Sequence, residues 1–305
     1  MIARAARAEI EEALGDRVQF EAKLARFTSL RVGGPADVLA TPADRADLSR
    51  LLGICARHRL PHLVLGAGFN TLALDAGLEG VVIQLGRLRG LEERPGGMLR
   101  AEAGVSHNQL IKFCIRHGFS GLEFGAGIPG TIGGWVAMNA GIPSREVQHV
   151  VREIEVMAPS GCAIRHLERN ALRFVYRGLR GLAPGSVILS ALFAVSFTTP
   201  ALVKAEVDRL LARRAQSQPL DVPSCGSVFK NPPGDHAGRL IELVGLKGHR
   251  LGGAQISPLH ANFIANLGGA TAADVLSLMR EAQTRVRAQT GRRLVPEVKV
   301  IGRKV

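Results

Sequence analysis

The chain has 305 residues, which is enough for about two domains of roughly 150 residues each. With 46% hydrophobic and 21% charged residues, the sequence is too apolar for a mainly disordered protein. Its formal net charge is +13, but the basic residues are scattered and aromatic residues make up only 4%. This pattern disfavours a nucleic-acid partner and leaves small anionic ligands or simple solubility as explanations of the charge.

Cysteine usage and hydropathy exclude several further classes. The four cysteines lie tens of residues apart without a Cys-x-x-Cys pair, so we expect neither a disulfide nor a metal site. The longest weakly polar stretch, residues 185–197, is shorter than the ~20 residues that a membrane-spanning helix needs. Glu9, Glu11 and Glu12 interrupt the apolar run that a signal peptide requires. We therefore expect a cytoplasmic protein with no membrane partner.

Helices and strands alternate in the first third of the chain. Residues 41–44 (Thr-Pro-Ala-Asp) offer an N-cap, a proline in the first turn and an early acid, and apolar residues follow at helical spacing, so we predict a helix there. Two apolar runs at 62–68 and 80–85 are bounded by glycine and predict buried strands. Ser106 is predicted to cap a second helix, which Gly118 ends.

The middle of the chain has a different character. Residues 153–167 predict a β-hairpin that turns at Ser160-Gly161, and residues 186–197 predict a long strand. Pro200 opens an amphipathic helix. The apolar residues of this helix are Leu202, Val207, Leu210 and Leu211. Residues 216–235 are rich in proline and glycine, as segments that cross between domains or build sites often are, so we place a domain boundary near residue 200.

The last third predicts a compact alternation of helices and strands. We expect a helix over 236–244, strands over 254–257 and 262–267, a helix that begins after Thr271, and a final strand over 294–302. An acid three residues after Thr271 supports a capping box at that helix start.

Glycine is concentrated in two segments, GAGFN at 66–70 and GAGIPGTIGG at 125–134. Backbone without side chains lets amide N–H groups approach phosphate oxygens, and a helix that begins at such a loop adds its dipole. Each segment is therefore a candidate pyrophosphate site. The first segment also fits a simple tight turn, since it lacks the Gly-x-Gly-x-x-Gly order. The second packs five glycines and a proline into ten residues and precedes a helix-like run.

These segments, followed by MNAG at 138–141, resemble the UDP-N-acetylenolpyruvoylglucosamine reductase (MurB) family. The resemblance covers nearly the whole chain from about residue 20. Its further motifs are FTSLRVGGPAD, FVYR, PSCGSVFKNP, GAQISPLHANFIAN and VPEVKVIG. The chain length and the GAQISPLHANF segment are similar to the type II branch, which lacks an extra substrate-covering loop. The resemblance implies a flavoenzyme that uses NADPH to reduce UDP-N-acetylglucosamine enolpyruvate to UDP-N-acetylmuramate in peptidoglycan precursor synthesis.

The resemblance also implies a fold. We expect an α+β protein with an FAD-binding domain of the vanillyl-alcohol-oxidase (PCMH) type, followed by a smaller α+β substrate-binding domain. The expected divisions are an N-terminal helical extension over 1–21, the FAD-binding domain with two α+β subdomains over 22–199, and the substrate-binding domain over 200–305. We also expect a monomer, with NADPH and a UDP-sugar as its partners.

The residues that would hold FAD follow from the same motifs. They are Gly66, Ala67, Gly68, Phe69, Asn70, Thr71, Gly127, Ile128, Pro129, Gly130, Thr131, Gly133, Gly134, Asn139, Ala140 and Gly141. The chain departs from the family at Phe69, where serine is usual, at Ile142-Pro143-Ser144, where Ala-Tyr-Gly is usual, and at Gly178, where serine is common. Without the serine hydroxyl, backbone amides must carry the phosphate contact. We expect Phe69 to pack against the domain as a structural aromatic.

Three residues match the family's catalytic positions. Ser227 matches the proton donor, Arg177 the arginine that stabilises charge developing on the substrate carboxylate, and Glu297 the acidic residue. The chemistry is consistent, because an enolate needs a preorganised cation and a proton source, and a guanidinium stays ionised and can bind a carboxylate with two hydrogen bonds. Spacing alone would make them a turn serine, a surface cation and an edge-strand acid.

Substrate contacts are implied for a second set of residues. They are Tyr176, Arg214, Asn231 and His260, with Arg213 as an alternative to Arg214 for the substrate diphosphate. The competing interpretations are a solvated helix face for the arginines, a turn asparagine and a core histidine. Two other functions stay open at this point: another FAD-dependent oxidoreductase on the same fold, and a basic nucleotide- or RNA-binding protein without flavin.

Overall fold

The computed structural model of the chain describes residues 2–303. Its α-carbons cluster into two compact units, and each unit is built from separate parts of the chain. Unit 1 comprises Met1–Phe20, Val38–Gly66 and Gly80–Arg213, and unit 2 comprises Glu21–Asp37, Ala67–Glu79 and Arg214–Val305. This division differs from a single boundary near residue 200, because unit 2 includes two segments from the N-terminal third of the chain.

Helices and strands are interspersed along the chain. The helices are α1 (Arg4–Leu14), α2 (Arg45–Arg57), α3 (His107–His117), α4 (Ile132–Ala137), α5 (Pro200–Ser217), α6 (Ala237–Leu243) and α7 (Ala272–Thr290). The strands of the N-terminal half are β1 (Val18–Lys23), β2 (Pro35–Ala40), β3 (His62–Val64), β4 (Thr71–Ala73), β5 (Leu78–Ile83), β6 (Leu91–Arg94), β7 (Met98–Glu102), β8 (Phe119–Ser120), β9 (Gly141–Ile142) and β10 (Arg145–Glu146). Those that follow are β11 (Val151–Met157), β12 (Ile164–Glu168), β13 (Arg173–Val175), β14 (Gly178–Arg180), β15 (Val187–Ala194), β16 (Ser196–Phe197), β17 (Ser224–Ser227), β18 (Arg250–Leu251), β19 (Ala254–Ile256), β20 (Phe263–Asn266) and β21 (Lys299–Ile301). The predicted α+β class is confirmed.

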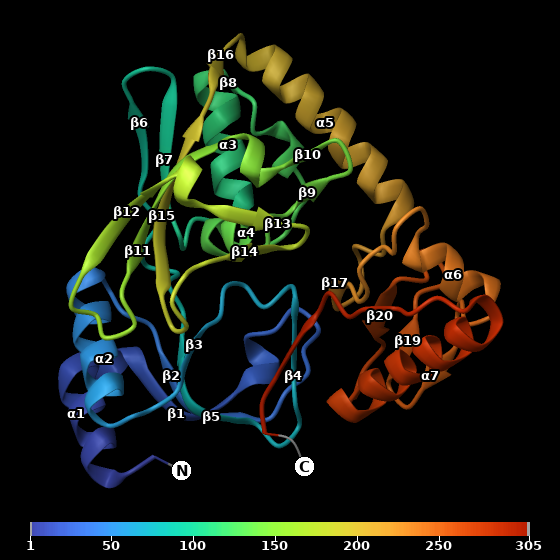
Figure 1. The fold of residues 1–305 in the computed structure, drawn as a ribbon, viewed down its shortest axis with the longest axis horizontal. Coiled ribbons are helices and arrows are strands. Elements are labelled where there is room, and N and C mark those ends of the chain that lie inside the picture. Colours follow the sequence, from blue (N-terminus) through green and yellow to red (C-terminus); the bar gives the residue numbers. More distant parts are fainter. Residues whose placement is uncertain (1, 304–305) are drawn as a thin grey trace. The chain divides into compact units, whose positions relative to one another are not determined.

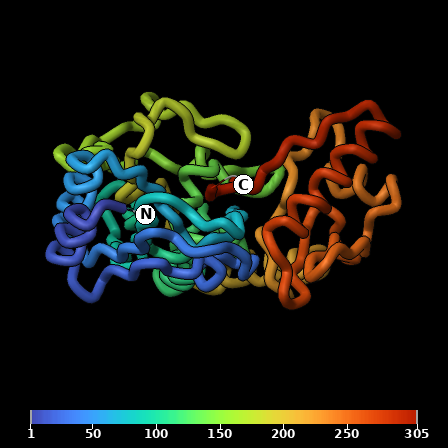
Figure 2. The backbone as a smooth tube through the Cα atoms, turned by 90° about the horizontal axis from the view of Figure 1, so that it is seen from below, coloured from blue at the N-terminus to red at the C-terminus, as the bar shows by residue number. Residues whose placement is uncertain are grey.

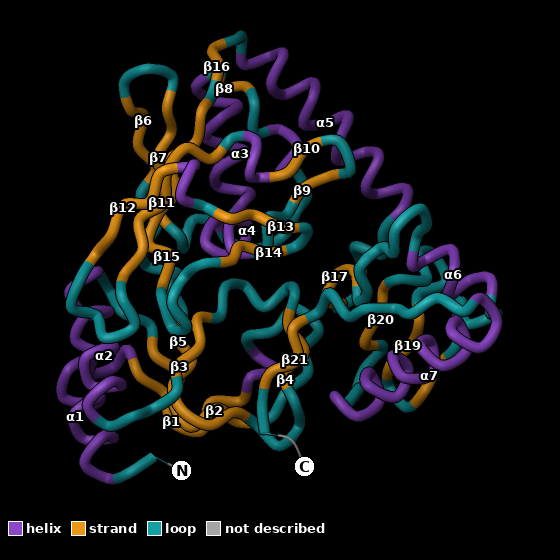
Figure 3. Tube along the Cα trace, in the orientation of Figure 1, coloured by secondary structure: helices purple, strands orange, loops and turns teal. Residues whose placement is uncertain are grey.

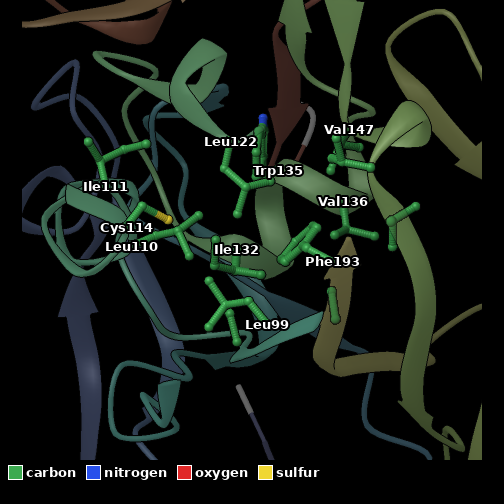
Figure 4. Packing of buried hydrophobic residues seen from close by; sticks show 14 of the residues in the cluster. Leu99, Leu110, Ile111, Cys114, Leu122, Ile132, Trp135, Val136, Val147 and Phe193 are labelled. Atoms are coloured by element: carbon green, nitrogen blue, oxygen red, sulfur yellow. The ribbon is translucent and has the colours of Figure 1, made fainter. Parts of the chain in front are cut away.

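The larger sheet of unit 1 is antiparallel, with strand order β12-β11-β15-β7-β6. Strands β11 and β12 form the predicted hairpin, in which the amide of Gly161 donates to the carbonyl of Ala158 at 2.9 Å. Helices α3 and α4 pack against this sheet (Figure 1) and share one apolar core with it. Trp135 and Phe193 meet at the centre of that core (Figure 4), where a fully buried large apolar side chain contributes about 1.5–3 kcal/mol.

The smaller sheet has strand order β1-β2-β5-β3, with β3 and β5 parallel. Helices α1 and α2 lie side by side, both blue in Figure 2, and pack their apolar faces in the core of this part of unit 1. The prediction of the α2 helix start needs a correction: the helix begins at Arg45 with Asp44 as its N-cap, and not within residues 41–44. The Asp44 carboxylate accepts from the amide of Asp47 at 2.9 Å, which satisfies a donor that would otherwise lack an intrahelical partner.

Two other helices of unit 1 test the sequence predictions. The Ser106 cap of α3 is confirmed as a full capping box with Gln109, and Gly118 ends the helix in the left-handed conformation. In α5, however, Leu202 and Leu211 are 62% and 42% exposed. The buried face of α5 is formed by Val203, Val207 and Leu210. These three residues stand at positions i, i+4 and i+7 and therefore lie on one side of the helix, which faces the core, whereas the two exposed leucines lie outside that side.

Unit 2 contains an antiparallel sheet of order β17-β20-β19-β18 and a parallel pair of strands, β4 and β21. Strands β4 and β21 are labelled next to each other in Figure 3. Helix α7 begins at the predicted capping box of Thr271 with Asp274 and packs with α6 on the unit's core. The final strand is shorter than the predicted 294–302 and begins only at Lys299. Pro296, which has no N–H to donate to a ladder, takes part only in an isolated bridge with Phe229. Among residues 2–303, no helix is long and apolar enough to cross a membrane.

Candidate active site

The second glycine-rich segment lies in unit 1 between a 3-10 turn at Glu123–Gly125 and helix α4. Gly127 and Gly130 have φ angles of 70° and 124°, a region that favours glycine. The segment is pinned from one side, because the amide of His107 donates to the carbonyl of Gly130 at 3.2 Å and Thr131 pairs with Ser106 in an isolated bridge. The loop is therefore a fixed piece of backbone and not a mobile linker.

Gly66, the first residue of the other glycine-rich segment, lies against this loop within unit 1. A Cβ at Gly66 would lie 2.9 Å from Oγ1 of Thr131, closer than side chains normally approach. The two segments, far apart in sequence, thus meet with no side chain at Gly66. A glycine backbone that faces a threonine hydroxyl offers hydrogen-bond donors to phosphate oxygens, so the residues present fit the phosphate part of FAD.

The rest of the first segment belongs to unit 2, where hydrogen bonds hold it in place. Gly68 has a φ of 69°, and a Cβ there would lie 2.4 Å from the carbonyl oxygen of Phe27. That carbon would clash with backbone, so only glycine fits. The amide of Ser29 donates to the carbonyl of Gly68 at 3.2 Å, while the Ser29 hydroxyl donates to the carbonyl of Ser224 at 2.7 Å. Ser29 thereby connects the glycine segment to strand β17.

The side chain of Phe69 is more exposed than we expected. Its side chain is 37% exposed, so the prediction of a buried structural aromatic is wrong. Gly68, the residue before Phe69, packs its backbone against Phe27 and Thr28, while the ring of Phe69 itself is partly exposed to solvent.

Ser227 and Glu297 lie on neighbouring backbone segments of unit 2. The carbonyl of Val228, the residue after Ser227, accepts from the amides of Glu297 and Val298 at 2.8 and 3.3 Å. The amide of Val228 in turn donates to the carbonyl of Asn262 at 2.8 Å. Main-chain hydrogen bonds thus bring together the segments of two predicted catalytic residues that are 70 positions apart in the sequence.

The first glycine segment also joins this cluster. The side-chain amide of Asn70 donates to the carbonyl of Glu297 at 3.2 Å, and the amide of Lys299 donates to the carbonyl of Asn70 at 3.0 Å. Burial, together with the charge of nearby Lys230, lowers the pKa of Lys299 below its usual value. A predicted cofactor residue and a predicted catalytic residue are therefore in direct contact within unit 2.

A cavity of about 290 Å³ in unit 2 opens beside Ser227. Asn231 and His260, two of the predicted substrate residues, line it as well. Burial lowers the pKa of His260, which favours the neutral ring. Its Nδ1 accepts from the amide of Asn262 at 3.2 Å, so the ring hydrogen belongs on Nε2. Asn231 has a structural contact too, because its Oδ1 accepts from the amide of Ala237 at 3.0 Å at the start of α6.

Arg177 lies in unit 1 at the tip of the hairpin formed by β13 and β14. Its side chain is 19% exposed, and Nη1 lies 3.2 Å from Oε1 of Glu146. Its guanidinium carbon also lies 4.7 Å from the ring centroid of Tyr176, the distance of a cation–π contact. Tyr176 itself is 45% exposed, which leaves its ring accessible to a ligand.

The two arginines considered for the substrate diphosphate differ in their surroundings. Arg214 donates from Nη2 to the side-chain oxygen of Gln218 at 2.9 Å, and burial lowers its pKa. Arg213 is exposed. Arg214 is thus the more buried of the two cations.

Sequence reasoning missed one residue of this region, Glu146. It follows the segment at 142–144 that departs from the family motif, and no spacing pattern marks it. Within residues 2–303, no group of histidine, cysteine, aspartate and glutamate side chains has the arrangement of a metal site.

The comparisons with known proteins agree with one another. Residues 36–166 match the family described as an FAD binding domain, and residues 218–301 match the family described as UDP-N-acetylenolpyruvoylglucosamine reductase, C-terminal domain. The chain is similar to the UDP-N-acetylenolpyruvoylglucosamine reductases of Anaeromyxobacter sp. (strain Fw109-5), with 46% identity over 97% of this chain and 92% of that protein, and of Geotalea uraniireducens (strain Rf4), with 40% identity over 97% and 98%. The crystal structure of the corresponding Thermus caldophilus reductase aligns with a TM-score of 0.81 and 36% identity, covering 93% of this chain and 99% of that one.

Proposed function

Since the chain belongs to the UDP-N-acetylenolpyruvoylglucosamine reductase family, we propose that it is an FAD-dependent oxidoreductase that reduces UDP-N-acetylglucosamine enolpyruvate to UDP-N-acetylmuramate in peptidoglycan precursor synthesis. NADPH as the source of electrons, a cytoplasmic location and a monomeric state are part of the same proposal. The observation that carries it is the cluster in unit 2, where Ser227 lines a cavity and its backbone segment is hydrogen-bonded to that of Glu297.

The glycine-rich segments would hold the cofactor. Gly66 has no side chain of its own and faces the hydroxyl of Thr131, and the pinned backbone from Gly127 to Gly130 needs no reorganisation to receive phosphate oxygens. FAD held there, once reduced by NADPH, would supply a hydride for the C3 carbon of the enolpyruvyl double bond. The amide side chain of Asn139 is already used within the protein, so any contact of this residue with FAD would come from its backbone.

The protein's own residues would manage charge and protons. The Ser227 hydroxyl would hold the proton that is delivered to the C2 carbon of the substrate, and such a positioned acid typically contributes about a hundred- to ten-thousandfold to the rate. The Arg177 guanidinium would stabilise the charge that develops beside the substrate carboxylate. Glu297 would supply an ionisable carboxyl group for the step in which the C2 carbon of the substrate is protonated.

The cavity beside Ser227 would receive the UDP-sugar. A neutral His260 ring with its hydrogen on Nε2 offers a donor to an oxygen of the ligand, and Asn231, which also lines the cavity, offers a further polar contact. The cation of Arg214, whose Nη2 donates to Gln218, would meet the diphosphate.

The test uses the purified full chain. We expect a yellow protein that contains FAD, turns over NADPH continuously under anaerobic conditions only when UDP-N-acetylglucosamine enolpyruvate is added, and yields a product heavier by two hydrogens. NADH in place of NADPH measures the preference between the two reductants. If NADPH bleached the flavin but the enolpyruvyl substrate never restored its colour, another flavin oxidoreductase would be favoured. A colourless protein that retains RNA would favour the nucleic-acid alternative.

A further inference from the structure

Glu146 is surrounded by hydrogen-bond donors in unit 1. Its Oε1 accepts from Nη1 of Arg177 at 3.2 Å, and its Oε2 accepts from the side-chain amides of Asn139 and Gln148 at 2.9 and 2.8 Å. The carboxylate also caps the short 3-10 turn that follows it, by accepting from the amide of His149. The Glu146 side chain is only 17% exposed. Its orientation is therefore fixed from several directions.

Asn139 connects this carboxylate to the hairpin of Arg177. It is completely buried, and its side-chain amide donates both to Glu146 and to the carbonyl of Val175, the latter at 3.1 Å. Its side-chain oxygen accepts from the amide of Gln148 at 3.1 Å. Val175 is the last residue of β13, two positions before Arg177. One amide group thus anchors both the carboxylate and the strand that carries the arginine.

The backbone in this region is strained at the two residues involved. Asn139 and Arg177 have φ angles of 43° and 57°, a left-handed conformation that asparagine tolerates and that arginine normally avoids. Such conformations persist where the surroundings over-determine them, and they concentrate at functional sites. Gly141 makes the arrangement possible, because a Cβ there would lie 2.1 Å from the carbonyl oxygen of Arg145 and would push away the strand that presents Glu146.

We infer that Glu146 is a positioning residue for Arg177, with Asn139 as its buried anchor. The inference rests on the proposed function. A guanidinium has five N–H donors in one plane, so a carboxylate that binds one edge fixes the direction in which the other edges face. In this arrangement Glu146 orients the cation towards the substrate carboxylate and does not itself touch the reacting atoms.

The experiment is a double-mutant cycle on the full-length, FAD-loaded protein. Glu146→Gln keeps the size of the side chain and removes its charge, and Arg177→Ala removes the group that it positions. Three quantities are measured for each variant: the rate of flavin reduction by NADPH, the rate of flavin reoxidation by the enolpyruvyl substrate, and the melting temperature. Glu168→Gln, which removes an exposed carboxylate on β12 of the same unit, is the matched control.

We expect Glu146→Gln to slow reoxidation about ten- to a hundredfold, the loss that corresponds to one hydrogen bond between charged groups, while the rate of flavin reduction stays within about twofold of wild type. In the Arg177→Ala background the same substitution should have no further effect on reoxidation, because there is no guanidinium left to position. Glu168→Gln should behave as wild type. Should Glu146→Gln fold poorly, Glu146→Asp retains the charge on a shorter side chain and is expected to slow reoxidation in the same selective way.

Two results would overturn the inference. One is an equal loss from Glu146→Gln in both backgrounds, which would make its effect independent of Arg177. The other is a lowered melting temperature with normal reoxidation in both Glu146 variants, which would make the residue purely structural. Normal reoxidation in Arg177→Ala alone would contradict the role of Arg177 in the proposed function as well, and it is recognisable because it appears without any Glu146 substitution.

Discussion

The predicted catalytic residues of the two units are held by different means. In unit 2, hydrogen bonds of Val228 and Asn70 hold the backbone of the segments that carry Ser227 and Glu297. In unit 1, Arg177 is placed by the side chains of Glu146 and Asn139 and by a strained backbone. A site held by backbone tolerates side-chain substitution without structural cost, whereas a site held by side chains does not. Substitutions in unit 2 should therefore separate activity from stability, and substitutions in unit 1 should couple them.

The largest effect is expected from Ser227→Ala. Turnover should fall about a hundred- to ten-thousandfold because a positioned proton donor is lost, while flavin reduction by NADPH and the melting temperature stay at the wild-type values. Stopped-flow measurement of the two half-reactions checks this expectation. The control is Ser224→Ala on the same strand, which should turn over normally. Equal slowing of both half-reactions would show that the hydroxyl is not a proton donor confined to the second half-reaction.

Glu297→Gln tests the same unit by removing a charge and keeping the shape. We expect flavin reoxidation to slow about a hundred- to a thousandfold, with unchanged affinity for the UDP-sugar in calorimetric titration, since the backbone contacts of residue 297 do not depend on its side chain. Glu281→Gln on α7 removes a charge elsewhere in unit 2 and should have no effect on rate. Unchanged turnover of Glu297→Gln would make this residue an ordinary acid beside a strand.

Acid should act on unit 1 through Glu155, a buried carboxylate. Burial alone would raise its pKa, but hydrogen bonds from Arg45, Ser190 and Arg100 outweigh that and lower the pKa from 4.5 to about 2. A carboxyl group with a lowered pKa in the folded state stabilises the fold above the unfolded pKa and loses that contribution as the pH falls. We expect up to about 3 kcal/mol of the free energy of unfolding to disappear between pH 4.5 and about 2.

The check is chemical denaturation of wild type and Glu155→Gln across that pH interval. The variant should be less stable at neutral pH and should show a flatter pH dependence below pH 4.5, because the titrating group is gone. Glu168→Gln, an exposed acid on the neighbouring strand, should retain the wild-type slope. Parallel curves for wild type and Glu155→Gln would assign the acid sensitivity to other carboxylates.

Phe69→Ser should have the smallest effect on stability. The ring is 37% exposed, so its loss should change the free energy of unfolding of the FAD-free protein by no more than about 0.5 kcal/mol. A serine hydroxyl at this position could donate to a phosphate oxygen, and we expect FAD to bind about tenfold more tightly. Calorimetry of the apoprotein and FAD titration check both numbers. A marked loss of melting temperature would restore the structural role first expected for this residue.

Local signals allowed much of the fold to be predicted. Local signals, which are side chains that satisfy nearby amides or glycine at a turn, correctly predicted the Ser106 and Thr271 caps and the hairpin at Ser160-Gly161. Of the two apolar runs predicted as buried strands, the second forms the buried strand β5, but the first forms only the short, partly exposed β3. The family resemblance rested on motifs of the same short range, and it is confirmed. The exposed leucines of α5 and the exposed ring of Phe69 could not be predicted in this way, because burial depends on which face meets the rest of the chain.

What the sequence determined by itself is therefore the set of elements, the family and the identity of Arg177, Ser227 and Glu297 as candidate residues. Only the tertiary structure decided that Val228 links the segments of Ser227 and Glu297, that Gly66 lies against Thr131, and that Glu146 meets Arg177. Each of these pairs joins segments that are separated along the chain, and no local pattern records such a pair. The physical reason is that contacts of this kind form only when the cores and sheets have brought distant backbone together, so their geometry is a property of the folded chain and not of any segment within it.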